Sequence, residues 1–508
     1  MRTLDELLGR IIDFGLIGLV VFTPLAFGTV EEWSIAVAQI VTIVITAVWV
    51  LRRVWFTNSR EHDSIRSGMM IPATLLVMIV VLQLVPLPAS WIRVLSPNTA
   101  TIFEQSLPGY PADGEGSFGD LPTWLRDNNS PEAGEVSMLS PAGDEIRNAL
   151  PTNAFDVQYA SRRSLSLTPA YTFRALQVLL AHLAMFFVAV DRFRNGRLGS
   201  KMLYSIAGLV GLLAIVGILQ QLTAEGNLYW FRSAGGSGSF GPFVSHNNFA
   251  GWMEMALPIT IGLAAWTWHR RVTAGTILLI FVSIVGCTSL IFSQSRGAVV
   301  ALGTALLVVG IAVMYFERLS MRVAILPIAI VGVAIPIALW VGGSDIQKRY
   351  ATFADLGGQT SLAFRWHTSL RTMEMARDFP ILGTGLGTFE EAYALRAAGS
   401  SPRRLIRAHN DYAQLLAEGG IGAGIAMGWA LVILFRKAIW PAIRGVRRFG
   451  RWPQRGACVG VIALLLHSFI DFNLQIYSNA ALFCVLCAYL MAGEVATTAS
   501  KSYKTRGC

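Results

Sequence analysis

The sequence predicts an all-α membrane protein with about twelve transmembrane helices. Of its 508 residues, 54% are apolar and only 14% are charged, and the mean hydropathy is +0.53. A soluble chain of this length would form two or more domains with far more charge on their surfaces. Apolar runs of about 18 or more residues, long enough to cross a bilayer, recur along the chain. The predicted spans are 11–28, 33–51, 69–87, 173–190, 202–222, 246–268, 274–292, 297–316, 322–341, 413–435, 457–472 and 478–495.

Basic residues predict how these spans are oriented, because Lys and Arg collect in cytoplasmic loops. With the amino terminus inside, the inner loop 436–456 holds seven basic residues, whereas the outer connections 29–32 and 473–477 hold none. The other inner loops, which are also basic, are 52–68, 191–201, 269–273 and 317–321. The net charge of +10 therefore reflects contact with anionic membrane lipids, and no nucleic-acid partner is expected. The first span lacks a small-x-small cleavage site and is expected to be retained.

Two long outer loops divide the spans into three groups. Residues 1–87 carry the first three spans, 173–341 the next six and 413–495 the last three, and the tail 496–508 is expected to be cytoplasmic. The first long loop, 88–172, is rich in Pro, Gly and Ser and holds ten carboxylates between Pro97 and Ala160. Its composition predicts a largely irregular segment.

The second long loop, 342–412, is basic and more regularly patterned. Leu362, Trp366, Leu370 and Met373 recur at helical spacing, and Pro380 closes the segment. This pattern predicts an amphipathic helix that lies on the outer membrane surface. Because a basic outer loop runs against the usual inside bias, its cations indicate an anionic ligand.

Uncommon polar residues are predicted to gather at the outer membrane face. Each has an ordinary explanation, such as a helix cap or a pair between Asp471 and His467 one turn earlier. Together they favour a site, because polar groups at membrane depth tend to face one another or a wet cavity. The residues concerned are His246, Asn247, Asn248, Ser293, Ser295, Arg296, Arg365, Arg407, His409, Asn410, Asp411, Asp471 and Asn473. Glu254, two turns into a span, fits a packing or hydrogen-bonding role equally well.

The chemistry of these residues suggests separate roles. Arg296 and Arg365 would supply fixed positive charge for phosphate, and the amino termini of neighbouring helices would add N–H groups. His409 would accept a proton from a hydroxyl, with Asp411 or Asp471 orienting it. The run from Gly383 to Gly387 is expected to be a flexible turn whose backbone can approach a phosphate.

Several other chemistries are not supported. The sequence contains no HExxH, GxxxxGK[ST] or GxSxG motif and no acidic DxD pair in an outer loop, so no metal, nucleotide cofactor or serine nucleophile is expected. Among its five cysteines, Cys484 and Cys487 form a CxxC inside an apolar run. Packing explains this pair better than redox chemistry or zinc.

The order of the motifs resembles the O-antigen ligase/polymerase family. The similarity lies in His246-Asn-Asn-Phe-Ala-Gly-Trp, Ser295-Arg296-Gly297 and Arg365-Trp366, followed by Pro380-Ile-Leu-Gly383-Thr-Gly385-Leu-Gly387. It continues with Ala408-His409-Asn410-Asp-Tyr-Ala-Gln-Leu-Leu-Ala-Glu418 and His467-Ser-Phe-Ile-Asp471. The resemblance covers about residues 240–475; the spans before it agree only in general layout.

This resemblance implies a GT-C-like membrane glycosyltransferase of the bacterial inner membrane. The implied donor is an undecaprenyl-diphosphate-linked glycan, used on the periplasmic side without a nucleotide sugar or an obligatory metal. The implied acceptor is a hydroxyl of a lipid or glycan. Arg296 and Arg365 would stabilise the leaving diphosphate, and His409 would deprotonate the acceptor in an inverting transfer.

The acceptor remains open at this point. Lipid A-core ligation, repeat-unit polymerisation of exopolysaccharide and protein O-oligosaccharyl transfer share these motifs, and the length of 88–172 resembles members from exopolysaccharide clusters. A transporter or flippase for lipid-linked sugars would also need a basic cavity, but no matched broken helices occur in the two halves. A non-catalytic assembly role also fits the sequence.

Overall fold

The computed structural model describes the helical body of the chain. The described residues are 2–56, 68–107, 110, 162–194, 198–224, 226–233, 238–317, 325–351, 360–396, 405–445 and 451–492. The acidic middle of loop 88–172 and the tail 496–508 therefore lie outside the described residues.

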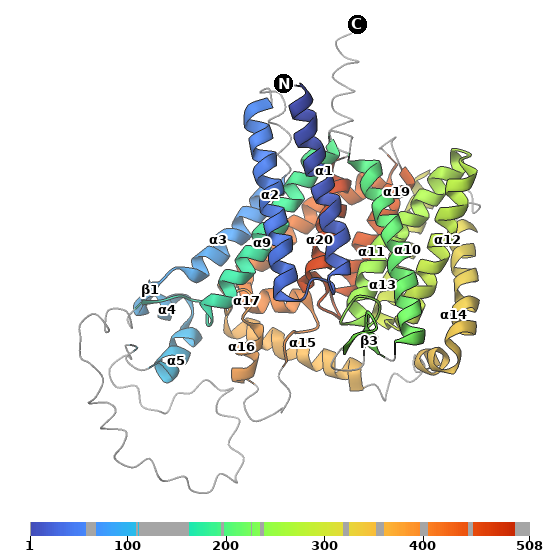
Figure 1. Cartoon of the computed structure of the whole chain (residues 1–508). Coiled ribbons are helices and arrows are strands. Elements are labelled where there is room, and N and C mark those ends of the chain that lie inside the picture. Colours follow the sequence, from blue (N-terminus) through green and yellow to red (C-terminus); the bar gives the residue numbers. More distant parts are fainter. Residues whose placement is uncertain are drawn as a thin grey trace. The chain divides into compact units, whose positions relative to one another are not determined.

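Each of the twelve predicted spans falls on a helix (Figure 1). The helices are α1 (Arg2–Leu25), α2 (Glu32–Phe56), α3 (Met70–Leu84), α9 (Pro169–Arg194), α10 (Gly199–Thr223), α11 (His246–His269), α12 (Thr273–Phe292), α13 (Arg296–Glu317), α14 (Ile325–Ala351), α17 (Asp411–Leu434), α19 (Arg451–His467) and α20 (Tyr477–Ala492). Within the described part of the chain, 8 helices are long and apolar enough to cross a membrane, and three shorter apolar helices accompany them. The fold is thus that of a multi-pass helical membrane protein, and the count of twelve spans stays a prediction.

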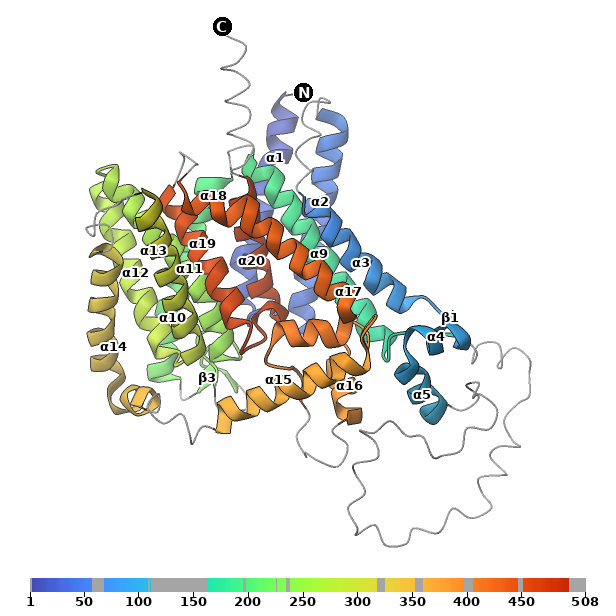
Figure 2. The same ribbon diagram turned by 180° about the vertical axis from the view of Figure 1, so that it is seen from behind.

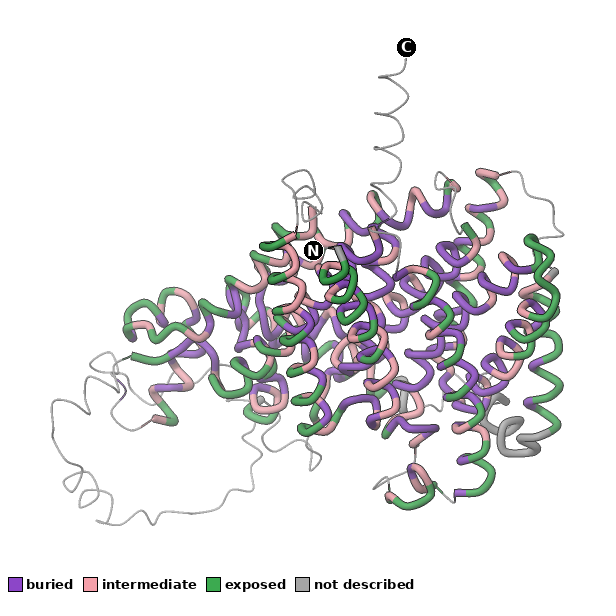
Figure 3. The backbone as a smooth tube through the Cα atoms, turned by 45° about the horizontal axis from the view of Figure 1, so that its top comes forward, coloured by how far each residue is buried: buried purple, intermediate pink, exposed green. Residues whose placement is uncertain are grey.

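Large apolar side chains face outward on several of these helices, as a bilayer environment requires. On α2, Ile40 is 60% exposed and Ile43 66%, and on α14 Ile328 is 65% exposed. Figure 3 shows such exposed turns alternating with buried ones along many helices. Lipid tails would cover this surface, so outward apolar residues carry no solvation cost there.

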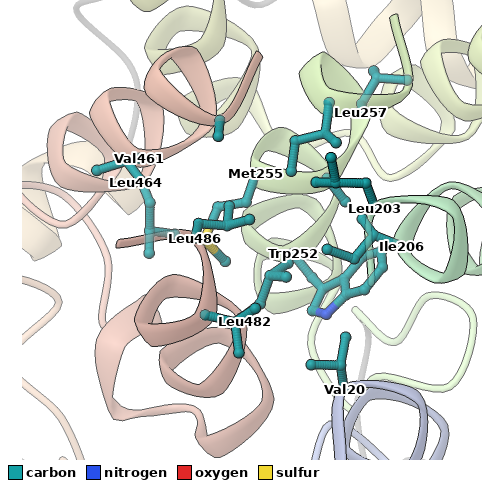
Figure 4. Packing of buried hydrophobic residues seen from close by; sticks show 14 of the residues in the cluster. Val20, Leu203, Ile206, Trp252, Met255, Leu257, Val461, Leu464, Leu482 and Leu486 are labelled. Carbon is teal, nitrogen blue, oxygen red and sulfur yellow. The ribbon is translucent and has the colours of Figure 1, made fainter. Parts of the chain in front are cut away.

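The chain divides into two compact units. Unit 1 comprises residues 1–71, 178–364 and 429–508, and unit 2 comprises 72–177 and 365–428. The core of unit 1 is continuous, and its largest fully buried side chain is that of Trp252 on α11. Figure 4 shows residues of α10, α11, α19 and α20 converging around Trp252 and Met255.

Ion pairs in unit 1 join the loops that were predicted to be cytoplasmic. They link Asp5 with Arg52, Asp191 with Arg53, and Glu317 with Arg451 and Arg455. The predicted outer connections meet separately, where Arg232 pairs with Glu31 and the Ser478 N–H donates to the Gly28 carbonyl. Each of these contacts joins segments that the charge pattern predicts on the same side of the membrane. Which face is cytoplasmic stays a prediction.

In unit 2, the long excursion after α3 is closed at its base. Strands β1 (Leu87–Pro88) and β2 (Arg162–Arg163) pair antiparallel and bring the two ends of the excursion together. The segment after β1 is helical, with α4 (Ala89–Leu95) and α5 (Pro97–Ser106), because Pro97 is well suited to a first helical turn and Ile92, Ala100 and Phe103 share a small core.

Two further helices belong to loop 342–412. α15 (Thr360–Asp378) ends two residues before Pro380, as predicted, and α16 (Phe389–Arg396) follows the glycine-rich turn. Figure 2 shows both helices together with α17. α14 runs to Ala351, ten residues past the predicted end at 341, because a helix can continue after its apolar run stops.

Candidate active site

A fully buried trio of titratable residues lies in unit 1. His467, at the end of α19, places Nδ1 3.1 Å from Glu254 Oε1 and Nε2 3.9 Å from Asp471 Oδ2. All three side chains are at most 1% exposed. The pair that the spacing of Asp471 and His467 suggested is present as a long contact, and Glu254 makes the shorter one.

Buried amides continue this polar interior. Asn479 Nδ2 donates to the Asn248 carbonyl at 3.0 Å and to Asn473 Oδ1 at 3.1 Å. A Cβ at Gly251 would lie 2.3 Å from Asn473 Oδ1, so only glycine lets α11 approach so closely. Packing against glycine thus fixes where these amides meet.

Arg296 is the first residue of α13. Its neighbour Gly297 leaves no room for a methyl group, because a Cβ there would lie 2.8 Å from His467 Nε2. The preceding turn has a left-handed residue, Gln294 at φ 57°, and a buried one, Ser295. Unit 1 therefore packs the backbone at Gly297, next to Arg296, against the imidazole that contacts Asp471. Arg296 itself stands at a helix amino terminus, where partial positive charge collects.

His246 and Asn247 open α11 in the same unit. Both are half-buried, and the His246 N–H donates to the Gly238 carbonyl. Both residues therefore stand at a second helix amino terminus, while the buried Asn248 joins the amide cluster through its backbone carbonyl.

Unit 2 holds Arg365, Arg407, His409 and Asn410. His409 has φ 52°, a left-handed conformation that a residue with a Cβ adopts at a cost. Asn410 caps α17, since its Oδ1 accepts from the N–H groups of Tyr412 and Ala413. The helix-cap explanation thus holds for this oxygen, and a substrate-binding role for Asn410 stays a prediction.

The glycine-rich turn between α15 and α16 does not behave as expected. We define the glycine loop as residues 383–389. Each of its seven N–H groups donates to an acceptor in unit 2, and these acceptors are the Phe379, Ala417, Glu418 and Gly385 carbonyls and the side chains of Gln83 and Glu418. The expectation of a flexible turn that offers its backbone to a phosphate is therefore wrong. The glycines serve close packing instead, because a Cβ at Gly383 would lie 2.2 Å from the backbone carbon of Glu418.

Three side chains that hold the glycine loop, directly or through one another, were not predicted from the sequence to have a role in the site. Gln83 donates to the Leu382 and Glu418 carbonyls at 2.5 and 2.8 Å and accepts from the Leu386 N–H at 3.0 Å. Glu418 accepts from Gly387, Phe389 and Gln414. Glu418 and Gln414 stand in the motif after His409, but no local signal marks Gln83, which precedes its partners by about 300 residues.

Arg365 lies on α15, whose surface is divided into stripes. Thr368, Thr372 and Met375 are buried, whereas Trp366 is 66% exposed, Leu370 44% and Met373 39%. The apolar repeat that predicted the helix therefore faces out of the protein. Exposed polar residues His367, Arg371 and Glu374 lie beside it, so the exposed surface is itself amphipathic.

No group of three or more His, Cys, Asp or Glu residues in the described part of the chain is arranged to hold a metal ion.

The predicted site residues fall into two sets, with His246, Asn247, Arg296 and Asp471 in unit 1 and Arg365, Arg407, His409 and Asn410 in unit 2.

Comparison with known proteins agrees with the motifs. Residues 278–428 match the family described as O-antigen ligase, a segment that includes Arg296, Arg365, Arg407 and His409. His246 and Asp471 lie outside the matched segment. A search of curated proteins finds no match to the chain. Residues 278–428 thus resemble an O-antigen ligase segment, which indicates an O-antigen ligase- or polymerase-like function in the membrane.

Proposed function

We propose that this protein transfers a glycan from an undecaprenyl-diphosphate donor to an acceptor hydroxyl at the periplasmic face of a bacterial inner membrane. The O-antigen ligase segment supports an enzyme of the glycosyltransferase kind that acts on lipid-linked glycans. The observation that carries the catalytic assignment is the strained backbone of His409 within that segment.

A left-handed residue other than glycine costs about 1–3 kcal/mol and persists only where its surroundings impose it. His409 is held on both sides, because the Ala408 N–H donates to Gln414 and Asn410 caps α17. Such strain clusters at functional sites, where it aims a side chain. An imidazole can accept a proton near neutral pH, which suits His409 as the general base.

In the proposed step, the acceptor oxygen gives its proton to His409 and forms a bond to the anomeric carbon. The bond from that carbon to the diphosphate oxygen breaks, and the configuration inverts. The departing diphosphate needs charge stabilisation, which Arg296 and Arg365 supply as guanidinium groups. Arg296 is aided by the amino terminus of α13.

The outward apolar stripe of α15 supports a position at the membrane surface. Trp366, Leu370 and Met373 would enter the boundary between headgroups and acyl chains, and His367 and Arg371 beside them would meet headgroups. Arg365 on the same helix would then stand at the depth of a lipid diphosphate.

Replacement of His409 tests the proposal. In cells that lack the chromosomal gene, His409→Ala and Arg296→Ala should insert into the membrane but abolish transfer of surface polysaccharide. His367→Ala, an exposed histidine on α15, is the matched control and should transfer normally. Normal polysaccharide in both His409→Ala and Arg296→Ala would refute the proposal.

The gene deletion itself distinguishes the acceptors. Loss of long-chain lipopolysaccharide with retained lipid-linked polymer would identify ligation. Accumulation of single lipid-linked repeat units would identify polymerisation. Gels of lipopolysaccharide and of the extracted lipid-linked glycans separate these outcomes.

A further inference from the structure

A chain of buried hydrogen bonds runs from the backbone beside His409 to the glycine loop. The Ala408 N–H donates to Gln414 Oε1 at 3.0 Å, and Gln414 Nε2 donates to Glu418 Oε1 at 2.9 Å. Glu418 in turn accepts from the N–H groups of Gly387 at 2.9 Å and Phe389 at 3.1 Å. Gln414 is 3% exposed and Glu418 4%, so water does not compete for these bonds.

In this series of hydrogen bonds, the chemistry of each group fixes which one donates and which one accepts. An amide has an acceptor oxygen and a donor nitrogen, so Gln414 can accept from Ala408 only while its nitrogen faces an acceptor. Glu418 is that acceptor, and three N–H groups converge on it, which suits a carboxyl acting as acceptor at both oxygens. The orientation of Gln414 therefore depends on Glu418.

This series of hydrogen bonds constrains the backbone conformation of His409. Its neighbours on both sides are tied to α17, Ala408 through Gln414 and Asn410 through the helix cap. Without the tie at Ala408, the segment before α17 can relax toward extended backbone and release the strain at φ 52°. The imidazole would then move with the backbone.

We infer that Gln414 and Glu418 are positioning residues that hold His409 in its strained conformation and couple it to the glycine loop. This inference rests on the proposed function, in which His409 is the general base. Gln414 and Glu418 take no proton in the reaction, and they act only through the backbone of Ala408.

Gln414→Glu gives a signature that a merely structural role would not produce. The substitution keeps an acceptor for the Ala408 N–H but places two carboxyl groups against each other. One shared proton can bridge them, whereas two ionised groups repel. Arg407 interacts electrostatically with Glu418. The variant should therefore transfer glycan while the shared proton is held and lose activity as the pH rises further and that proton is lost.

Gln414→Met keeps the volume and removes both hydrogen bonds at every pH. Because a misplacement of about 1 Å can cost about 100-fold in rate, we expect kcat to fall 10- to 100-fold with little change in KM for the donor. Gln220→Met is the matched control: Gln220 is also buried and also bridges two backbone groups, Gly241 O and the Tyr229 N–H. It should lose a similar amount of thermal stability but keep its kcat.

The assay uses the full-length protein in lipid nanodiscs with an undecaprenyl-diphosphate-linked glycan and a soluble acceptor, with kcat measured between pH 5 and 9. The inference predicts a new fall in kcat with rising pH in Gln414→Glu alone. A wild-type pH profile in Gln414→Glu, or an unchanged kcat in Gln414→Met, would overturn it. Failure of the proposed function looks different, because His409→Ala would then remain active.

Hydrogen exchange gives an independent reading if Gln414→Glu does not fold. In Gln414→Met, amide exchange in the peptide that contains Ala408 should accelerate more than tenfold, while peptides from α11 keep wild-type rates. Unchanged protection at Ala408 would show that Gln414 does not hold this segment, and the inference would fall.

Discussion

Replacement of Gly297 by alanine tests whether the buried His467 fixes the position of Arg296. A Cβ at Gly297 would lie 2.8 Å from His467 Nε2 and 2.9 Å from Ile470 Cδ1. Nonbonded heavy atoms rest at about 3.5 Å or more, so each contact must open by about 0.6–0.7 Å. His467 has little freedom to withdraw, because it is fully buried and its Nδ1 is bonded to Glu254 at 3.1 Å.

The expected destabilisation follows from two opposing terms. Overpacking of this kind costs about 1–3 kcal/mol. Alanine recovers at most about 1 kcal/mol of helix propensity relative to glycine. The net loss of stability should be about 1–2 kcal/mol, taking the middle of the overpacking range. Since the start of α13 must shift by a good part of an ångström, we expect transfer to slow by about tenfold or more.

Two glycines in the same helix are matched controls. A Cβ at Gly303 or Gly310 would meet no atom within 4 Å, so Gly303→Ala and Gly310→Ala should be neutral or slightly stabilising. Thermal unfolding in nanodiscs and initial rates of glycan transfer are compared across the three variants. If Gly297→Ala matched Gly303→Ala in both measurements, the contact with His467 would not position Arg296.

Three further predictions concern other parts of the protein. Glu254→Ala removes the hydrogen-bond partner of His467 Nδ1 in a buried setting, which should cost about 1–3 kcal/mol; Glu254→Gln keeps an acceptor and should melt at a higher temperature than Glu254→Ala. A polarity-sensitive fluorophore on Trp366→Cys should report an apolar surrounding and be quenched by lipid spin-labelled on its acyl chains, whereas the same probe on Arg371→Cys should report the polar, hydrated headgroup region; equal quenching at the two positions would contradict the interfacial orientation of α15. Burial raises the pKa of Tyr229 from 10.0 to about 12, and its hydroxyl donates to the Leu25 carbonyl. Because folding favours the neutral phenol, the stability that Tyr229 contributes should be lost as the pH rises from 10 to 12. Tyr229→Phe should therefore flatten the dependence of the melting temperature on pH in that range, measured by thermal unfolding.

The positions of the helices could be predicted because an apolar run long enough to cross a bilayer is a local property of the sequence. The same is true of α15, where the apolar repeat and Pro380 marked both the helix and its end. The extension of α14 to Ala351 carried no such mark, because the helix continues beyond its apolar residues. Local pattern also missed α4 and α5, since their stability comes from a core shared with Ile79 and Leu382, which are distant in sequence.

For the candidate site, residue type alone selected the residues to consider, and their roles stay predictions. Arginine, histidine and aspartate at membrane depth stand out in any apolar chain. The glycine loop was misinterpreted because its backbone partners, among them Gln83 and Glu418, become visible only when the chain is folded. Spacing within α11 likewise gave no means of choosing between a packing role for Glu254 and its bond to His467.

The occupied N–H groups of the glycine loop change where the charge for a diphosphate must come from. A phosphate-binding loop works by pointing several unbonded N–H groups at the anion, and in this protein residues 383–389 point theirs at protein acceptors. In the proposed reaction the stabilisation therefore rests on Arg296 and Arg365, with the amino terminus of α13 in support. Guanidinium groups keep their charge at any physiological pH, so loss of activity with pH should report on His409 and not on anion binding. An Arg296→Lys variant should accordingly lower transfer through lost bidentate contacts while leaving the pH profile of kcat unchanged, and a shifted profile would place Arg296 in the proton transfer instead.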